Sequence, residues 1–125
     1  MSSEVLSFFE GHEGALPIYT ALEEKLAAMI PEMEIKVQTS QISFYHQRLF
    51  ACVSFLPVRK KQDRPENYLT VTFGLPHLME SGRIDGATEP YPQRFTHHMT
   101  VGTPAEIDDE VLSWLREAAD FAAAK

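Results

Sequence analysis

Apolar residues recur at helical spacing in the first third of the chain. The segment from Ser3 to Glu10 has this spacing and predicts a short helix that ends before Gly11. A second such segment runs from about Leu16 to Ile30, with Pro17 in its first turn and Pro31 directly after it. Proline is tolerated in a first helical turn and cannot continue a helix, so both prolines fit the ends of this helix.

The C-terminal segment carries the clearest helix signal. Thr103, Pro104 and Glu106 match a capping box, which predicts a helix N-capped by Thr103 with Pro104 at its first position. Apolar side chains then follow on one helical face, which is typical of a helix packed on a core. They are Ile107, Val111, Trp114, Leu115, Ala118, Phe121 and Ala122.

Between these helices the apolar positions alternate with a period of two, as in strands. Residues 42–56 predict two strands joined by a tight turn near Gln47 and Arg48. The second of them, Leu49–Leu56, is apolar on both faces like a central strand.

Three further segments complete the predicted sheet and its connections. Residues 68–74 and 94–101 alternate cleanly, and residues 34–40 predict one more short strand. Residues 82–95 contain proline and glycine without periodicity and predict a long irregular connection, which in compact domains is often functional.

The order of these elements predicts an α+β fold with two N-terminal helices, a four- to five-stranded, mostly antiparallel sheet and a C-terminal helix. Packing all helices on one sheet face is the economical arrangement. A chain of 125 residues suits one domain. We therefore expect a single domain over residues 1–125, with the first 14 or so residues as a helical extension.

The net charge of −7 is unevenly distributed along the chain. Residues 1–34 carry −6 and residues 106–125 carry −4, whereas residues 35–105 carry +3. The predicted strands and their loops are therefore mildly basic between acidic helices. No apolar run approaches the ~20 residues that span a bilayer, and the N-terminus lacks a signal-peptide pattern. A single cysteine, Cys52, excludes an internal disulfide, so we expect a cytoplasmic protein without a membrane partner.

Two adjacent histidines, His97 and His98, lie in the predicted strand 94–101. Successive strand residues point to opposite faces, so this pair does not form a shared metal site. His97 alternates with the apolar residues Phe95 and Met99 and is expected in the core as a hydrogen-bonded structural histidine. His98 is expected on the other face.

The face that includes His98 is polar and is the candidate binding surface. The same alternation places on it Lys36, Gln38, Ser43, Tyr45, Tyr68, Thr70, Thr72, Arg94, Thr96, His98 and Thr100, with no carboxylate among them. Beside it lies the basic loop 57–67. Such a face can bind an anion or single-stranded nucleic acid by charge and stacking, although antiparallel sheets commonly leave one polar face in water. The candidate ligand-binding residues are Tyr45, Tyr68, Arg94, His98, Arg59, Lys60, Lys61 and Arg64.

The sequence lacks the motifs that mark several common kinds of binding or catalytic site. Neither phosphate-binding glycine motif is present, and neither H-E-x-x-H nor a paired C-x-x-C occurs, so no metal or cofactor is expected. Cys52 is expected to be a small buried hydrophobic residue rather than a nucleophile. Asp85 and Glu89 are interpreted as surface loop charges rather than as a catalytic pair.

Three segments resemble a known family. They are "SQISFYHQRLFACVSFLPVRKKQDRPENYLTVTFGL", "EPYPQRFTHHMTV" and "EIDDEVLSWLREAADFA". Together they resemble the bacterial domain of unknown function 5655, over roughly residues 15–123. This resemblance implies a small cytoplasmic α+β domain without assigned catalytic residues. Because similar domains are attached to predicted endonucleases, it also favours a nucleic-acid-associated accessory role.

Three functions remain open at this point. The favoured one is a binding or accessory module whose polar face and basic loop hold an anionic ligand or nucleic acid. The second is a protein-interaction module or homodimer. The third is a small enzyme with His98 as general acid or base, which requires a carboxylate or hydroxyl within hydrogen-bond reach of His98.

Overall fold

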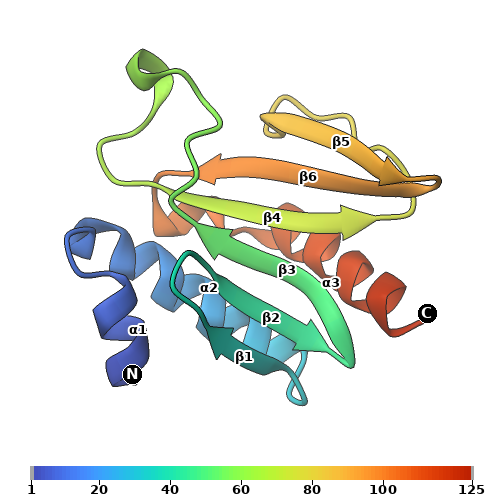
Figure 1. Ribbon diagram of the computed structural model, residues 1–125, viewed down its shortest axis with the longest axis horizontal. Coiled ribbons are helices and arrows are strands. Elements are labelled where there is room, and N and C mark those ends of the chain that lie inside the picture. Colours follow the sequence, from blue (N-terminus) through green and yellow to red (C-terminus); the bar gives the residue numbers. More distant parts are fainter. Residues whose placement is uncertain (1, 125) are drawn as a thin grey trace.

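A six-stranded antiparallel sheet carries two long helices on one face (Figure 1). The computed structural model describes residues 2–124, so the two end residues of the expected domain 1–125 lie outside the described part. The helices are α1 (Ser3–Phe8), α2 (Leu16–Met29) and α3 (Asp109–Ala123). Short 3-10 turns are η1 (Glu13–Ala15), η2 (Lys61–Asp63) and η3 (Pro104–Glu106). The strands are β1 (Glu34–Val37), β2 (Ile42–His46), β3 (Arg48–Ser54), β4 (Leu69–Leu75), β5 (Gly86–Tyr91) and β6 (Arg94–Val101).

The strand order across the sheet is β1-β2-β3-β4-β6-β5, and every neighbouring pair is antiparallel. The predicted α+β class and the antiparallel sheet are confirmed. The predicted turn at Gln47 is confirmed as well, since this residue has a φ of 66° between β2 and β3. The expected count of four to five strands is wrong, because the sheet has six.

The additional strand is β5, which lies in the segment expected to be an irregular connection. It pairs only with β6 and forms one edge of the sheet, and most of its residues are exposed. The pairing register shifts between Thr88 and Tyr91. An edge strand that is exposed on both faces needs no apolar alternation, so this segment carries no period-two signal.

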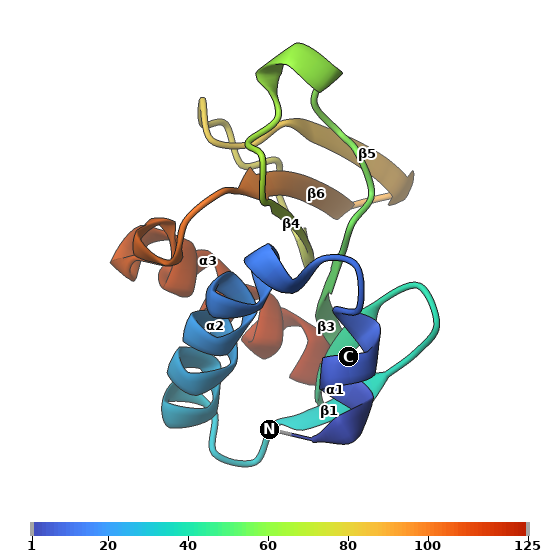
Figure 2. The same ribbon diagram turned by 90° about the vertical axis from the view of Figure 1, so that its left-hand side faces the viewer.

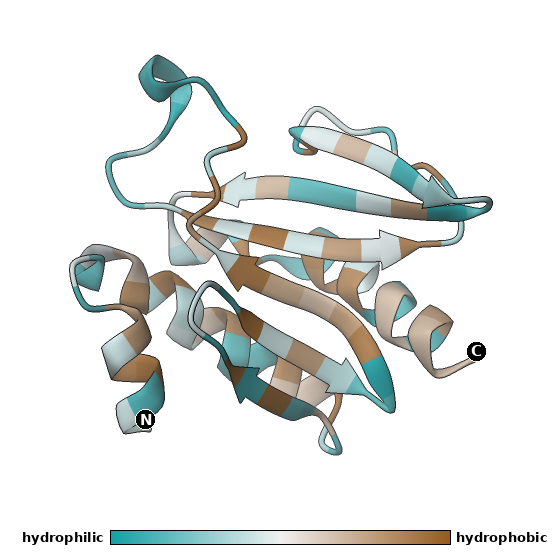
Figure 3. Ribbon diagram, viewed as in Figure 1, coloured by the Kyte–Doolittle hydropathy of each residue, from teal (hydrophilic) through white to brown (hydrophobic). Residues whose placement is uncertain are grey.

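The core lies between the sheet and the helices α2 and α3, which occupy the same side of it (Figure 2). The buried strand residues Phe44, Val71 and Met99 are on this side, and α3 packs against β2, β3 and β4. From α2, the ring of Tyr19 stacks on Phe44 with centroids 6.3 Å apart. Figure 3 shows the resulting alternation of hydrophobic and hydrophilic residues along the strands. The predicted packing on one face is confirmed for α2 and α3.

The six-residue helix α1 lies beside β1, at the edge of the sheet, and α2 is the one long helix of the N-terminal part. Val5 and Phe9 of this segment are buried. The ring of Phe9 lies 5.3 Å from that of Tyr19 and 5.4 Å from that of Phe55. The first residues therefore pack into the core through an aromatic cluster.

The helix α3 begins later than its sequence signal predicts. The segment at Pro104–Glu106 closes only the 3-10 turn η3, in which the Glu106 carboxylate accepts the backbone N–H groups of Gly102 and Thr103. The helix proper starts at Asp109, and the Asp108 side chain caps it by accepting the Val111 N–H at 3.1 Å. The predicted start of the helix at Thr103 is wrong. Thr103 caps only the turn η3, and Asp108 caps the helix α3, with the buried Ile107 between the two.

Candidate functional site

The face of the sheet away from α2 and α3 is the candidate site, and Figure 1 is viewed from this side. The strand register places a row of aligned residues across it, running from the β1 edge to the β5 edge. The row consists of Lys36, Ser43, Cys52, Thr72, His98 and Gly86. We call this surface the open face, and the alternation predicted for the strands now numbered β4 and β6 is confirmed by the register.

The two adjacent histidines lie on opposite faces, as predicted. His97 is fully buried in the core, where its ring stacks on Phe73 and its Nε2 accepts the backbone N–H of Met79 at 2.9 Å. His98 lies on the open face with its Nδ1 2.8 Å from the hydroxyl oxygen of Thr72. Burial lowers the pKa of both histidines, which favours the neutral imidazole at neutral pH. His98 thus has the hydroxyl partner that acid–base chemistry requires.

One end of the open face is closed by the chain itself. Thr70 is fully buried, and its hydroxyl donates to the carbonyl of Leu56 at 2.6 Å. Thr100 and Ser43 are buried too, and Ser43 exchanges hydrogen bonds with side chains of the β1–β2 turn. The expectation that all these hydroxyls are displayed is therefore wrong for three of them. The accessible part of the open face therefore lies at the end of β2 and at the starts of β3 and β6.

The basic loop 57–67 contains two kinds of cation. Lys60 and Lys61 are exposed at its tip, which projects from the molecule and is hydrophilic (Figure 3). Arg59 instead forms an ion pair with Asp85, with Nε 2.9 Å from Oδ1. Asp85 Oδ2 also accepts the Thr100 N–H at 2.7 Å, so Arg59 and Asp85 tie the loop to β6. The interpretation of Asp85 as a surface loop charge is wrong because its carboxylate is mostly buried in this contact.

Two further candidates, Arg64 in this loop and Tyr68 directly after it, also have structural contacts. The Tyr68 hydroxyl donates to the carbonyl of Phe55 at 2.9 Å. The guanidinium carbon of Arg64 lies 5.8 Å from the Tyr68 ring centroid. Both side chains are only partly exposed, so they shape the base of the loop beside the open face.

Tyr45 on β2 is partly exposed on the open face and lies opposite Glu34 of β1. The Lys36 ammonium lies 5.1 Å from the Tyr45 ring centroid, close enough for a cation–π contact. Glu34 has the same strand parity as Lys36 and lies on the same face. The expectation of a face without carboxylates is therefore wrong at this edge of the sheet, where an exposed glutamate accompanies the lysine.

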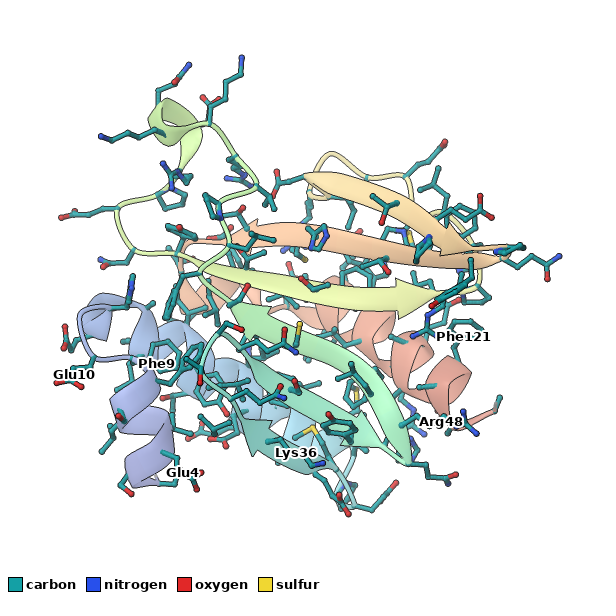
Figure 4. The ribbon with its side chains drawn as sticks, in the orientation of Figure 1. Glu4, Phe9, Glu10, Lys36, Arg48 and Phe121 are labelled. Atoms are coloured by element: carbon teal, nitrogen blue, oxygen red, sulfur yellow. The ribbon has the colours of Figure 1, made fainter. Side chains whose placement is uncertain are left out.

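Two arginines meet at the end of the sheet where β3 and β6 begin. The guanidinium carbon of Arg94 lies 5.9 Å from the ring centroid of Phe121 on α3. Arg48 is exposed, and Figure 4 labels Arg48 and Phe121 at this end of the sheet. Both arginines line a hollow of about 390 Å³ together with Tyr45. Within residues 2–124 neither arginine has a carboxylate in ion-pair distance. Sequence reasoning missed Arg48 because it assigned this residue to the predicted turn, whereas Arg48 is the first residue of β3.

Cys52 also lies on the open face, contrary to the expectation of a buried hydrophobic position. It is partly exposed and pairs across the sheet with Ser43 and Thr72. Burial raises the pKa of its thiol, and the Thr72 hydroxyl offsets part of this rise. The thiol is thus favoured over the thiolate at neutral pH, which agrees with the view that Cys52 is not an activated nucleophile.

Two kinds of feature are absent from the described residues 2–124. In this part of the chain no group of three or more His, Cys, Asp or Glu side chains is arranged to hold a metal ion. None of the described helices is both long and apolar enough to cross a membrane.

The fold and the site define a small α+β domain in which one sheet face carries helices and the other presents polar and basic side chains. The chain belongs to the DUF5655 family, a domain of unknown function, whose family model matches residues 5–122. No curated protein and no solved structure matches the chain.

Proposed function

We propose that the protein is a binding module whose open face holds an anionic ligand, with single-stranded nucleic acid as the first candidate. The observation that carries the proposal is a group of three cations, Lys36, Arg48 and Arg94, on or beside the open face. Among residues 2–124 none of them has a carboxylate in ion-pair distance, whereas Arg59, Arg83 and Arg116 are all ion-paired. Cations without such partners keep their charge and donors available to a bound anion.

The aromatic and loop residues support the same proposal. Tyr45 lies between Lys36 and Arg48, and base stacking on an aromatic side chain contributes about 1–3 kcal/mol per base in single-strand binding. The exposed Lys60 and Lys61 extend the positive charge beyond the sheet. The net charge of −7 opposes general binding to duplexes and favours a local contact.

The test is amide chemical-shift mapping with a short single-stranded oligonucleotide at low salt. We expect Lys36, Tyr45, Arg94 and His98 to shift together. Three phosphate contacts predict that the logarithm of the affinity falls with the logarithm of the salt concentration with a slope of about −2. The variant Arg94→Ala weakens binding, whereas the matched variant Arg116→Ala on α3 does not. Unchanged spectra at millimolar oligonucleotide would contradict the proposal.

A small enzyme that uses His98 is the second candidate, supported by the hydrogen bond between His98 Nδ1 and Thr72. A neutral imidazole with a lowered pKa can accept a proton from a bound ligand. The check is conversion of the bound oligonucleotide by the unmodified chain and by His98→Gln. Conversion lost in the variant, with binding retained, supports this candidate. The cytoplasmic location and bacterial origin stay predictions of the sequence.

A further inference from the structure

A small recess opens on the open face above β4, next to the hollow that contains Arg48 and Tyr45. Its floor includes Cys52, Thr72 and Gly74, and its rim includes Leu49, Arg94 and Thr96. The recess has a volume of about 100 Å³, and it shares Leu49 and Arg94 with the neighbouring hollow of about 390 Å³. The two therefore form one continuous concave surface with Arg94 between them.

The recess exists because residue 74 has no side chain. Gly74 lies in the interior of β4, where glycine packs poorly and often marks the close approach of a ligand. The protein itself does not need a glycine there. An added Cβ would find its nearest heavy atoms, Arg94 Nη2 and the Phe95 carbonyl oxygen, at 3.9 Å, which is an ordinary van der Waals contact. An alanine side chain would therefore fit at this position without a clash, in contact with the guanidinium of Arg94.

The chemistry of the walls differs between the two parts of the surface. The recess is lined by apolar residues, among them Leu49, Phe50 and Ala51, together with Thr72 and Thr96. Leu49 is 41% exposed, so an apolar side chain faces solvent at the rim. Beyond it, Arg94 and Arg48 present planar guanidinium groups, which match a phosphate with two parallel hydrogen bonds each.

We infer that this surface takes one nucleotide unit, with its planar base in the Gly74 recess and its phosphate between Arg94 and Arg48. The inference rests on the proposed binding of an anion at the open face and specifies the chemical class of that anion. The recess is much smaller than the ~300–1,000 Å³ sites of larger ligands, so it suits a single ring rather than a whole dinucleotide. Thr96 at its rim is suited to the polar edge of a base, and Leu49 to its face.

Filling the recess is the direct test. The variant Gly74→Val places a side chain where the base is inferred to lie, and Gly74→Ala does so with a single carbon that meets nothing closer than 3.9 Å. The matched control is Gly82→Ala, where an added Cβ has no heavy atom within 4 Å and which does not line the recess. Thermal unfolding of all three checks that they fold.

The probes are adenosine 5′-monophosphate, inorganic phosphate and a short 5′-phosphorylated single strand. We expect the mononucleotide to shift the amides of Cys52, Thr72 and Gly74, and Gly74→Val to weaken it about tenfold or more, in line with the loss of one stacked base. Gly74→Ala weakens it less, and Gly82→Ala leaves it unchanged. Inorganic phosphate, which lacks a base, binds the Gly74 variants and the unmodified chain equally.

The outcomes separate this inference from the proposed function. If the single strand binds the Gly74 variants as tightly as the control, the recess does not hold a base, and the inference fails while anion binding at the open face stands. If none of the probes binds, both fail. If the single-stranded oligonucleotide binds far more tightly than the mononucleotide, the bound nucleotide unit belongs to a nucleic acid. If the two affinities are equal, the ligand is a free nucleotide. Either of these two results supports the inferred chemistry.

Discussion

At the scale of single residues, the partner of a side chain decides its role. Arg59 and Arg94 both belong to the basic middle of the chain. Arg59 forms an ion pair with the mostly buried Asp85, so its charge is neutralised within the fold. Arg94 packs on the Phe121 ring and has no carboxylate of residues 2–124 in ion-pair distance, so it remains able to bind an anion. Sequence alone could not separate the two, because Asp85 lies 26 positions away from Arg59.

His97 provides a residue-scale prediction about pH. Burial lowers the pKa of His97 in the folded chain, so below about pH 6.5, the pKa of an unperturbed histidine, the unfolded chain binds more protons than the folded one. We therefore expect the free energy of unfolding to be highest above that pH and to fall as the pH is lowered through it. Urea unfolding between about pH 8 and pH 5 measures the change.

The matched variants for this prediction are His97→Gln and His12→Gln. Glutamine at position 97 cannot titrate and still offers an oxygen to the Met79 N–H, so it should reduce the pH dependence, and His98, whose pKa burial also lowers, supplies the remainder. The variant His12→Gln removes an exposed histidine outside the sheet and serves as the comparison. Equal pH dependence in both variants would show that another group is responsible.

At the scale of elements, the basic loop is docked at its base and projects only at its tip. Pro65 packs on Gly102, Asn67 lies against Gly14, and Arg59 binds Asp85. These contacts join the loop to β6 and to the start of α2. The loop therefore holds Lys60 and Lys61 in a defined place beside the open face.

Gly102 gives an element-scale prediction about this docking. A Cβ at position 102 would lie 2.7 Å and 2.9 Å from two carbons of the Pro65 ring, which is too close, so the loop must shift. We expect Gly102→Ala to lower the free energy of unfolding by about 1–3 kcal/mol, the usual cost of overpacking, and to move the amides of residues 64–68. In Gly82→Ala, where an added Cβ has open space, both should stay unchanged. A Gly102→Ala chain as stable as this control would mean that the contact with Pro65 is not required.

At the scale of the whole molecule, the two sheet edges bear on the alternative of a homodimer. The edge strand β5 contains Pro90, which has no N–H to donate, and a register shift. The other edge, β1, is four residues long and carries the charged Glu34 and Lys36. Short strands, prolines, irregular registers and charges all oppose pairing of sheets edge to edge.

We therefore expect sedimentation to give the mass of one chain from micromolar to millimolar concentration. A mass that rises with concentration would support the homodimer or protein-interaction alternative instead. In that case amide-shift changes between dilute and concentrated samples would locate the contact. Changes confined to the open face would mean that association of two chains covers the same surface as the proposed binding of an anion.

Much of the molecule follows from local patterns in the sequence. Strand alternation was enough to place His97 in the core and His98 on the open face, because side-chain direction in a strand depends only on position. The helices α2 and α3 follow from apolar stripes in the same way. The strand β5 was missed because an exposed edge strand has no apolar side to mark it.

The candidate site was foreseen only in part. Alternation predicts the open face correctly and places Tyr45, Arg94 and His98 on it. The closure of one end over Thr70 depends on a contact with Leu56, and the recess over Gly74 depends on neighbours in β3 and β6. Neither has a local sequence signal.

The sequence by itself determined which residues form strands and helices and which side of each strand is apolar, because these depend on spacing along the chain. The tertiary structure alone decided which cations are paired, which hydroxyls are covered and where a hollow remains. Arg48, Gly74 and Arg94 are brought together by the order β3-β4-β6, which joins three segments that are distant in the chain. Long-range pairing of this kind is set by the packing of the whole core, so no local pattern contains it.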